Sequence, residues 1–196
     1  MSTIVIGLNN SNAVLINIED KIPEHEHIWI WDHFFSLVLN RMKSDDDMAQ
    51  ALLDSISEWA VGFANKMYSP INELHAEGAL KIDKNIKITD SLTDREQMIM
   101  IEVTSQIGSW PTVHAKISDD IDNNSLNKSV IALAHYFLSN NTNFFRELPM
   151  HVLGMRKFYN EDTPFTDASS ISEAPAFAFN LALKFYEDLD KKMQRQ

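Results

Sequence analysis

The chain has 196 residues, of which 44% are hydrophobic, and this composition is typical of a globular protein and not of a disordered one. Its formal net charge of −11 repels phosphate backbones, so we expect no direct binding to nucleic acid. No apolar run approaches the roughly 20 residues of a membrane-spanning helix, and no secretory signal is visible, so we expect no membrane association.

The N-terminal segment predicts a β-hairpin. Residues 3–8 and 13–18 are short runs rich in β-branched residues, and the turn-forming sequence Asn-Asn-Ser-Asn lies between them. Both runs are apolar at nearly every position. We therefore expect both faces of the hairpin over residues 3–18 to be covered, with helices packed over it.

The densest apolar stretch of the chain follows Pro23 and has the sequence EHEHIWIWDHFFSLVLNRMK, over residues 24–43. At helical spacing, its apolar and aromatic side chains occupy most of the circumference of a helix. Such a helix must be covered on most sides. We therefore predict that it is the central helix of the fold.

Further helices are expected along the rest of the chain. Ser44 and three following aspartates begin a helix that continues to about Met67, and the short connection predicts an antiparallel pair with the central helix. A Thr-Asp-Arg-Glu capping box at 93–96 predicts a helix to about Ile107. The other predicted helices are residues 70–77, residues 126–140, residues 144–159 with a break or kink at Pro149, and a long final helix from Ser172.

Two segments between these helices are less regular. Residues 112–117 fit either a strand or a further helical turn, and both alternatives stay open at this point. Residues 118–125, with the sequence SDDIDNNS, are acidic and rich in turn-forming residues. They predict an exposed loop or a boundary.

Residues 80–88 alternate between apolar and polar or charged side chains and predict a second hairpin, in which a three-residue turn pairs Ile82 with Ile86. The order of a long helix, a short helix and a hairpin over residues 45–88 resembles a winged-helix module. A DNA-reading helix would carry basic residues, and residues 71–77 contain none. The resemblance would then imply peptide or protein binding at the sheet edge, and the alternative is local packing without a function of its own.

The predicted fold is mainly α (α+β by strict count). Six or seven helices pack around the aromatic-rich central helix, with one or two short β-hairpins attached. We expect one globular domain over residues 1–196, with the hairpin at 3–18 followed by a helical body at 23–196.

Seven histidines in an acidic chain could include metal ligands or acid–base groups. The spacing of His25 and His33 would allow both to project from one side of a helix, and Glu147 and His151 are four residues apart with Pro149 between them. The candidate metal ligands are His25, His27, His33, Glu73, His75, Glu147 and His151. The alternative is that the histidines cap helices or lie at their boundaries, in which case no cofactor is expected.

Recognisable catalytic motifs are missing from the sequence. It contains no Gly-x-Ser-x-Gly elbow, no Gly-x-Gly-x-x-Gly and no P-loop pattern. The absence of cysteine excludes disulfides, thiolate ligands and a thiol nucleophile. It also suits a reducing cytoplasm, where we expect the protein to be located.

The acidic excess is confined to one part of the chain. Residues 1–66 hold 10 acidic and 4 basic side chains, residues 67–125 hold 10 and 5, and residues 126–196 hold 8 of each. This asymmetry favours a non-enzymatic interaction protein, of inhibitor, immunity or accessory-subunit type, which binds a basic protein partner. Solubility is the plainer explanation of the charge. The second function hypothesis is a small helical metal-binding protein or metalloenzyme with a transition metal, and a homo-oligomer is compatible with either.

Overall fold

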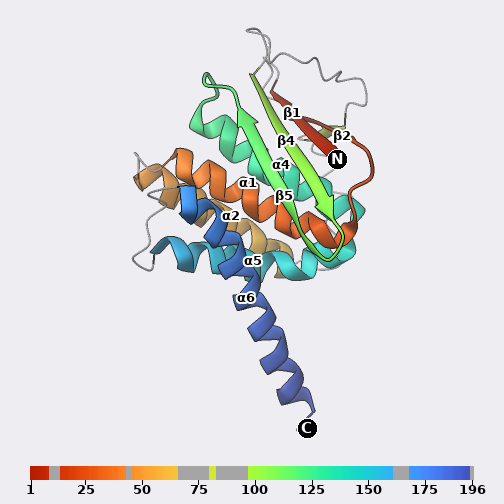
Figure 1. The fold of residues 1–196 in the computed structure, drawn as a ribbon. Coiled ribbons are helices and arrows are strands. Elements are labelled where there is room, and N and C mark those ends of the chain that lie inside the picture. The colour runs from red at the N-terminus through yellow and green to blue at the C-terminus, as the bar shows by residue number, and fades with distance from the viewer. Residues whose placement is uncertain (9–13, 43–45, 66–79, 83–96, 161–167, 195–196) are drawn as a thin grey trace.

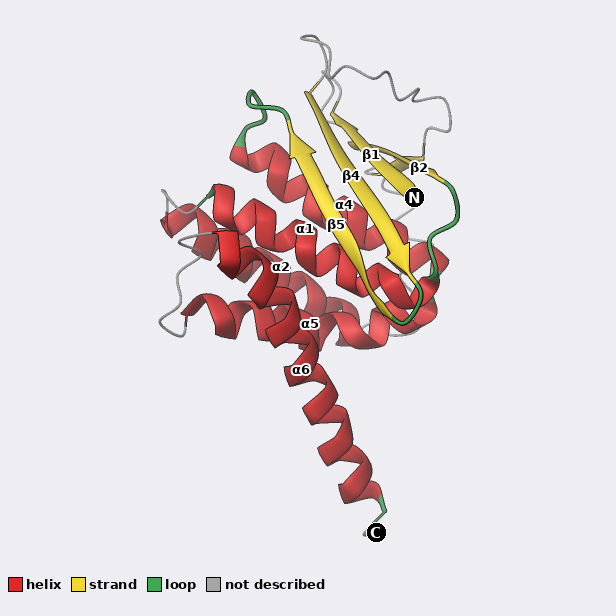
Figure 2. Ribbon diagram, viewed as in Figure 1, coloured by secondary structure: helices red, strands yellow, loops and turns green. Residues whose placement is uncertain are grey.

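The computed structural model describes residues 1–8, 14–42, 46–65, 80–82, 97–160 and 168–194. They form a β-sheet on one side and a group of helices on the other (Figures 1 and 2). The strands are β1 (Ser2–Leu8), β2 (Val14–Glu19), β3 (Leu80–Ile82), β4 (Gln97–Gln106) and β5 (Ser109–Ile117). The helices are the short 3-10 helix η1 (Glu24–Glu26) and the α-helices α1 (His27–Arg41), α2 (Asp46–Asn65), α4 (Asn123–Asn140), α5 (Thr142–Asn160) and α6 (Ala168–Met193).

The sheet has the order β3-β2-β1-β4-β5, in which β3 is parallel to β2 and the other neighbours are antiparallel. The register aligns isoleucines in rows, so that Ile4 lies opposite both Ile18 of β2 and Ile101 of β4. These residues belong to the core shared with the helices. Val5, whose side chain points to the other face, is also fully buried, which agrees with the expected burial of both faces. The N-terminal hairpin is therefore confirmed.

The helix α1 is the centre of the fold, as predicted. It packs against α4, α5, α6 and β5. Two tryptophan side chains fix it to its neighbours: the Trp31 indole N–H donates to the Val130 carbonyl of α4 at 3.0 Å, and the Trp29 N–H donates to the Pro111 carbonyl of β5 at 3.1 Å. Near its C-terminus, Arg41 donates to carbonyl oxygens just after β5.

The predicted antiparallel pair of α1 and α2 is wrong. The main neighbour of α2 is α5, and it also contacts α4. The reason is that the surface of α1 is already taken by β5, α4, α5 and α6. A short connection favours neighbouring helices, but the apolar face of α2 is buried wherever an uncovered apolar surface remains.

The predicted helix ending near Ile107 is also wrong, because residues 97–106 form β4. The physical reason is the alternation of Ile99, Ile101 and Val103, which are buried, with more exposed residues between them. In a strand this alternation places one side of β4 in the core, where it pairs with β1 and β5. Residues 112–117, left open between strand and helix, belong to β5, and Gly108 with φ of 80° forms the turn between β4 and β5.

The described residues contain five α-helices, fewer than the six or seven helices predicted, together with the short 3-10 helix η1. The predicted helix at 70–77, the turn of the hairpin at 80–88, and hence the winged-helix resemblance lie wholly or partly outside the described residues. The helix α5 continues through Pro149, where a break or kink was expected, and α6 begins four residues before Ser172. No helix among the described residues is sufficiently long and apolar to cross a membrane.

The close contact between α5 and α6 depends on Gly154. A Cβ atom at this position would lie 2.6 Å from the Ala178 Cα atom and 2.9 Å from its Cβ atom. These distances are shorter than a carbon–carbon contact allows, and the Cα atom is backbone that cannot rotate away. Glycine at this position therefore lets the two helices approach each other.

We expect Gly154→Ala to lower the free energy of unfolding by about 1–3 kcal/mol, because the overpacked methyl group forces the helices apart. This loss should appear even though, at an exposed helix position, replacing glycine by alanine stabilises the helix by about 1 kcal/mol. Urea unfolding followed by circular dichroism measures the change. Asn143→Ala, at an exposed position of the same helix, is the control, and a stabilised Gly154→Ala protein would contradict the packing described here.

Candidate functional site

The most deeply buried pair of ionisable groups in the described residues joins α1 to α5. An Asp32 carboxylate oxygen, Oδ2, lies 2.5 Å from His151 Nδ1. The Asp32 side chain is 0% exposed and the His151 side chain 2% exposed. Because buried charges are costly unless they are paired, this contact is the first candidate for a functional site.

The surroundings of this pair are mainly apolar. The Phe179 ring of α6 lies edge-on to the His151 ring, with 6.2 Å between the ring centroids. Ser36 donates its hydroxyl to the backbone carbonyl of Asp32 at 2.8 Å, and its oxygen is 3.9 Å from the Met155 sulfur. The second carboxylate oxygen, Asp32 Oδ1, has no hydrogen-bond partner among the described residues. The carboxylate therefore depends on His151 for its compensation.

Electrostatic effects raise the pKa of both partners. Burial raises the pKa of Asp32 above 3.8, and the neighbouring His151 opposes this rise. Burial alone would lower the pKa of His151, but the Asp32 carboxylate, their hydrogen bond and the Glu147 carboxylate raise it above 6.5. We therefore expect the pair to hold one proton at neutral pH. The stabilising contribution of His151 is full below pH 6.5 and is lost as pH rises through its folded-state pKa.

The chemistry open to this pair is limited by its burial. An aspartate on Nδ1 is the arrangement that orients a histidine for acid–base catalysis, with the other ring nitrogen facing the substrate. A catalytic base must come within hydrogen-bond distance of the proton that it removes. A His151 side chain that is 2% exposed does not meet this requirement in the conformation described. The geometry therefore fits a buried connection between two helices better than a catalytic pair.

Glu147 and His151, predicted as candidate ligands, lie on the same continuous helix despite Pro149 between them. They are close enough for the Glu147 carboxylate to raise the pKa of His151. Burial raises the pKa of Glu147 itself, while His151 opposes the rise. The structure thus brings these two candidates together beside Asp32, which the set of predicted ligands did not include.

His27, another candidate ligand, packs between residues of α4 and of the connection between α4 and α5. Its ring is buried and stacked on Phe137, with 4.3 Å between centroids and 15° between the ring planes. The Asn141 amide lies 3.4 Å from His27 Nδ1 and donates to the Glu24 carbonyl at 2.8 Å. Burial lowers the pKa of His27 below 6.5, which favours the neutral ring. These contacts fix η1 and α1 against the connection between α4 and α5.

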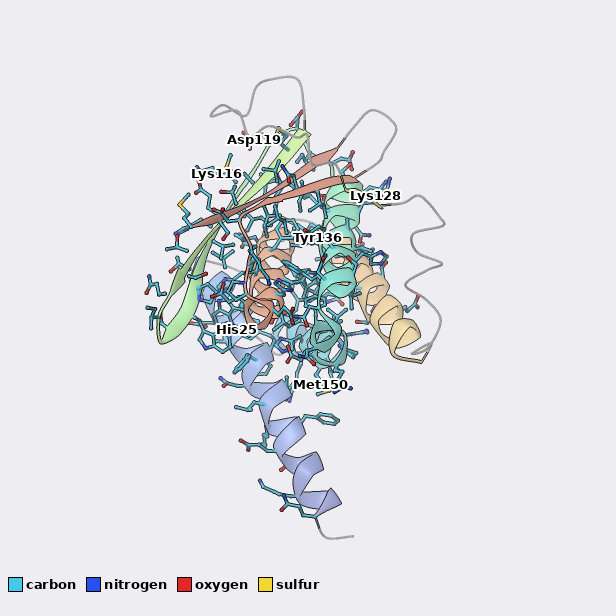
Figure 3. All side chains as sticks on the ribbon, turned by 90° about the vertical axis from the view of Figure 1, so that its right-hand side faces the viewer. His25, Lys116, Asp119, Lys128, Tyr136 and Met150 are labelled. Atoms are coloured by element: carbon cyan, nitrogen blue, oxygen red, sulfur yellow. The ribbon has the colours of Figure 1, made fainter. Side chains whose placement is uncertain are left out.

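His25 and His33, expected to project from one side of a helix, have different surroundings. His25 is exposed on η1, as Figure 3 shows. The His33 ring is partly buried and meets Trp29 edge-on, with 4.8 Å between centroids. Trp29 in turn stacks on Trp110 of β5, and Phe179 of α6 meets both tryptophans edge-on. His33 is therefore part of an aromatic cluster at the junction of α1, β5 and α6.

The metal hypothesis receives no support from the part of the chain that the structure describes. Within it, no three His, Asp or Glu side chains are placed to hold a metal ion. Glu24 and His27 have the i, i+3 spacing of a metal-ligand pair, but Glu24 is exposed and His27 is buried. Glu73 and His75 lie outside the described residues, so their role as ligands stays a prediction.

A line of acidic side chains lies on the outer face of α2. Asp47, Asp54 and Glu58 are exposed, and with Ala51 they follow the i, i+4, i+7, i+11 spacing of one helix face. Asp54 forms an ion pair with Arg156 of α5 at 2.7 Å. We call Asp47, Asp54 and Glu58 the acidic line. It is part of the charge excess that the sequence placed in the first two-thirds of the chain.

Asp32 is the functional candidate that the sequence reasoning missed. It is not among the candidate ligands predicted from the sequence. A signal was nevertheless present, because Asp32 falls in line with Ile28, Phe35 and Leu39 at helical spacing on an apolar face. A charged residue in such a line must be paired inside the protein. What the sequence did not contain was the identity of the partner, 119 residues away.

Compared with protein-family models, with curated proteins and with solved structures, the chain gives no significant match.

We expect acid to destabilise the protein through two partly buried histidines that are neutral in the folded state. Burial lowers the pKa of His33 and of His135 from 6.5 to about 4. A histidine with a lowered folded-state pKa makes its full contribution to the stability of the folded protein above pH 6.5. This contribution is lost as pH falls toward 4, because the unfolded chain binds the proton first. From pH 7 to pH 5, each should cost about 2 kcal/mol of unfolding free energy.

Urea unfolding at pH 7 and pH 5 measures this loss, and His33→Gln should reduce the difference between the two pH values by about 2 kcal/mol. Asn143→Ala, which removes no titratable group from an exposed position of α5, is the control and should leave the difference unchanged. An equal difference in wild type and His33→Gln would contradict the burial of a neutral imidazole beside Trp29.

Proposed function

We propose that this chain is a non-enzymatic interaction protein that binds a basic protein partner through its acidic N-terminal two-thirds. The observation that carries the proposal is the acidic line of α2, in which three carboxylates share one exposed helix face. Complementary charge on a partner would steer its approach and select it over acidic proteins.

The placement of the basic residues supports the same proposal. Arg41, one of 4 basic residues in the first 66, points back into the protein, where its guanidinium donates to the carbonyls of Ser118 and Asp119 at 3.0 and 2.9 Å. Its charge therefore lies beside the residues that follow β5 and not on the acidic line of α2. The segment that follows β5 carries three exposed carboxylates, at Asp119, Asp120 and Asp122.

The use of the other polar groups also favours binding over catalysis. Asp32 and His151 are paired in the core, and His27 is held by Asn141 and Phe137. Glu26 is buried and accepts a hydrogen bond from the Ser105 hydroxyl at 2.7 Å. These groups hold helices and strands together, which is a sufficient reason for their burial. A cytoplasmic location remains a prediction from the absence of cysteine.

The test is a pair of double charge reversals with the same net charge. Asp47→Lys/Glu58→Lys removes most of the acidic line and leaves the Asp54–Arg156 ion pair in place. Glu173→Lys/Glu187→Lys changes two exposed carboxylates of α6 and is the matched control. Proteins bound by wild type and by both variants from native lysate are identified by mass spectrometry over a range of salt concentrations.

We expect a basic protein to be retained by wild type and by the α6 variant, to be lost from the α2 variant, and to dissociate as salt rises. Far-UV circular dichroism confirms that both variants are folded. Retention of the same proteins by the α2 variant, or no basic protein bound by wild type, would contradict the proposal.

A further inference from the structure

A second surface lies between α5 and α6, and it adjoins the acidic line where Arg156 of the groove pairs with Asp54. An open groove of about 580 Å³ is lined there by Met150 and Leu153 of α5 and by Leu181 and Phe185 of α6. Leu153 is 51% exposed and Phe185 46% exposed, and Leu183 of α6 is 49% exposed. The other exposed large hydrophobic residues of the described chain are scattered elsewhere, at Met1, Met48, Ile107 and Trp110. Clustered exposed apolar side chains indicate a binding surface, whereas single ones do not.

The helix α6 extends beyond the body of the protein from this groove. Its C-terminal half projects away from the other helices (Figures 1 and 2), and Met150 marks the place where it leaves them, far from Asp119 at the end of β5 (Figure 3). After Ala182, which is buried, the described side chains of α6 at positions 183–185, 187, 188 and 191 are all exposed. An exposed helical extension gains little stability by itself, since most helical stability comes from packing an apolar face.

Four charged side chains line the groove: Arg156 and Lys157 of α5, and Lys184 and Asp188 of α6. Arg156 is paired with Asp54 of α2, and Asp188 lies 3.7 Å from Lys191 of its own helix. Lys184 and Asp188 are one turn apart on α6, on the same side as Leu181 and Phe185. Leu181, Lys184, Phe185 and Asp188 have the i, i+3, i+4, i+7 spacing of a helix–helix contact.

We propose that the groove is occupied by α6 of a second copy of this chain, antiparallel to the first and related to it by a two-fold axis. In such an interface the same patch meets itself, so each contact occurs twice. The two-fold axis passes between Lys184 and Phe185. Lys184 of one copy then lies against Phe185 of the other copy, and it reaches Asp188 of that other copy, one helical turn further along. Lys184 thereby makes a cation–π contact and an ion pair, and both are repeated by symmetry.

A second copy fits better than an unrelated partner because α6 supplies both halves of the contact. The groove requires a helix that is apolar on one side and carries an acid opposite Lys184, and the projecting part of α6 carries Phe185 and Asp188 at the required spacing. In the dimer, the apolar patch of each copy covers that of the other. This proposal goes beyond the interaction function and does not involve Asp47 or Glu58.

The experiment is sedimentation velocity of the full chain over a range of concentrations, with four variants. Wild type should sediment at twice the mass of the chain. Phe185→Glu places a carboxylate in the centre of the interface and should give a monomer. Ile107→Glu makes the same change at an exposed hydrophobic residue in the turn between β4 and β5, and should leave the dimer intact.

Charge exchange tests the antiparallel arrangement. Lys184→Glu gives each copy two acids at the contact, and Asp188→Lys gives each copy two cations, so each variant alone should dimerise about tenfold more weakly or worse. An equimolar mixture should restore a dimer, because the acidic α6 of one variant then meets the basic α6 of the other.

Loss of the dimer in Phe185→Glu together with its recovery in the mixture would support the proposal. A monomeric wild type would overturn it and leave the groove for a different protein. A dimer unaffected by Phe185→Glu would overturn it by placing the interface elsewhere. A mixture that stays monomeric would overturn the antiparallel contact. Circular dichroism of each variant confirms that the fold is retained.

Discussion

The packing of this protein depends on a charged contact in the middle of its helical core. Asp32 is on the apolar side of α1, fully buried, and its carboxylate is compensated by His151 of α5. Taking a carboxylate out of water is costly, and this cost is offset only while the imidazole stays in place. The contact therefore specifies how α5 lies on α1, because a shift of either helix would leave a buried charge without its partner.

Other elements are arranged around that contact. The helix α5 is fixed to α6 where Gly154 meets Ala178, and Phe179 of α6 then lies against His151. On the other side, the tryptophans of α1 bind it to α4 and β5 through their N–H groups. These polar contacts all lie where close apolar packing holds the two elements in place. Among the candidate ligands, Glu147 and His151 lie together beside Asp32, whereas His27 and His33 belong to other junctions.

Much of the architecture was predictable, and the failures have definite causes. The hairpin of β1 and β2 and the central α1 followed from patterns that lie within one element. The strand β4 was mistaken for a helix because Met98 and Ile101 also fit a helical spacing, and only its pairing with β1 and β5 decides the outcome. The Asp32–His151 contact could not be predicted in full, since sequence spacing says nothing about a partner on a distant helix. The surface groove depends on where α6 leaves the body, which is equally a tertiary property.

The most direct test of this account is a double-mutant cycle on the buried pair, measured as the free energy of unfolding at pH 6. We predict that Asp32→Ala and His151→Ala each cost about 3–5 kcal/mol, because each leaves one buried polar group without its partner. The double variant should then cost clearly less than the sum of the two single variants, by about 1–3 kcal/mol. Costs that simply add would contradict the claim that Asp32 and His151 compensate each other in the core.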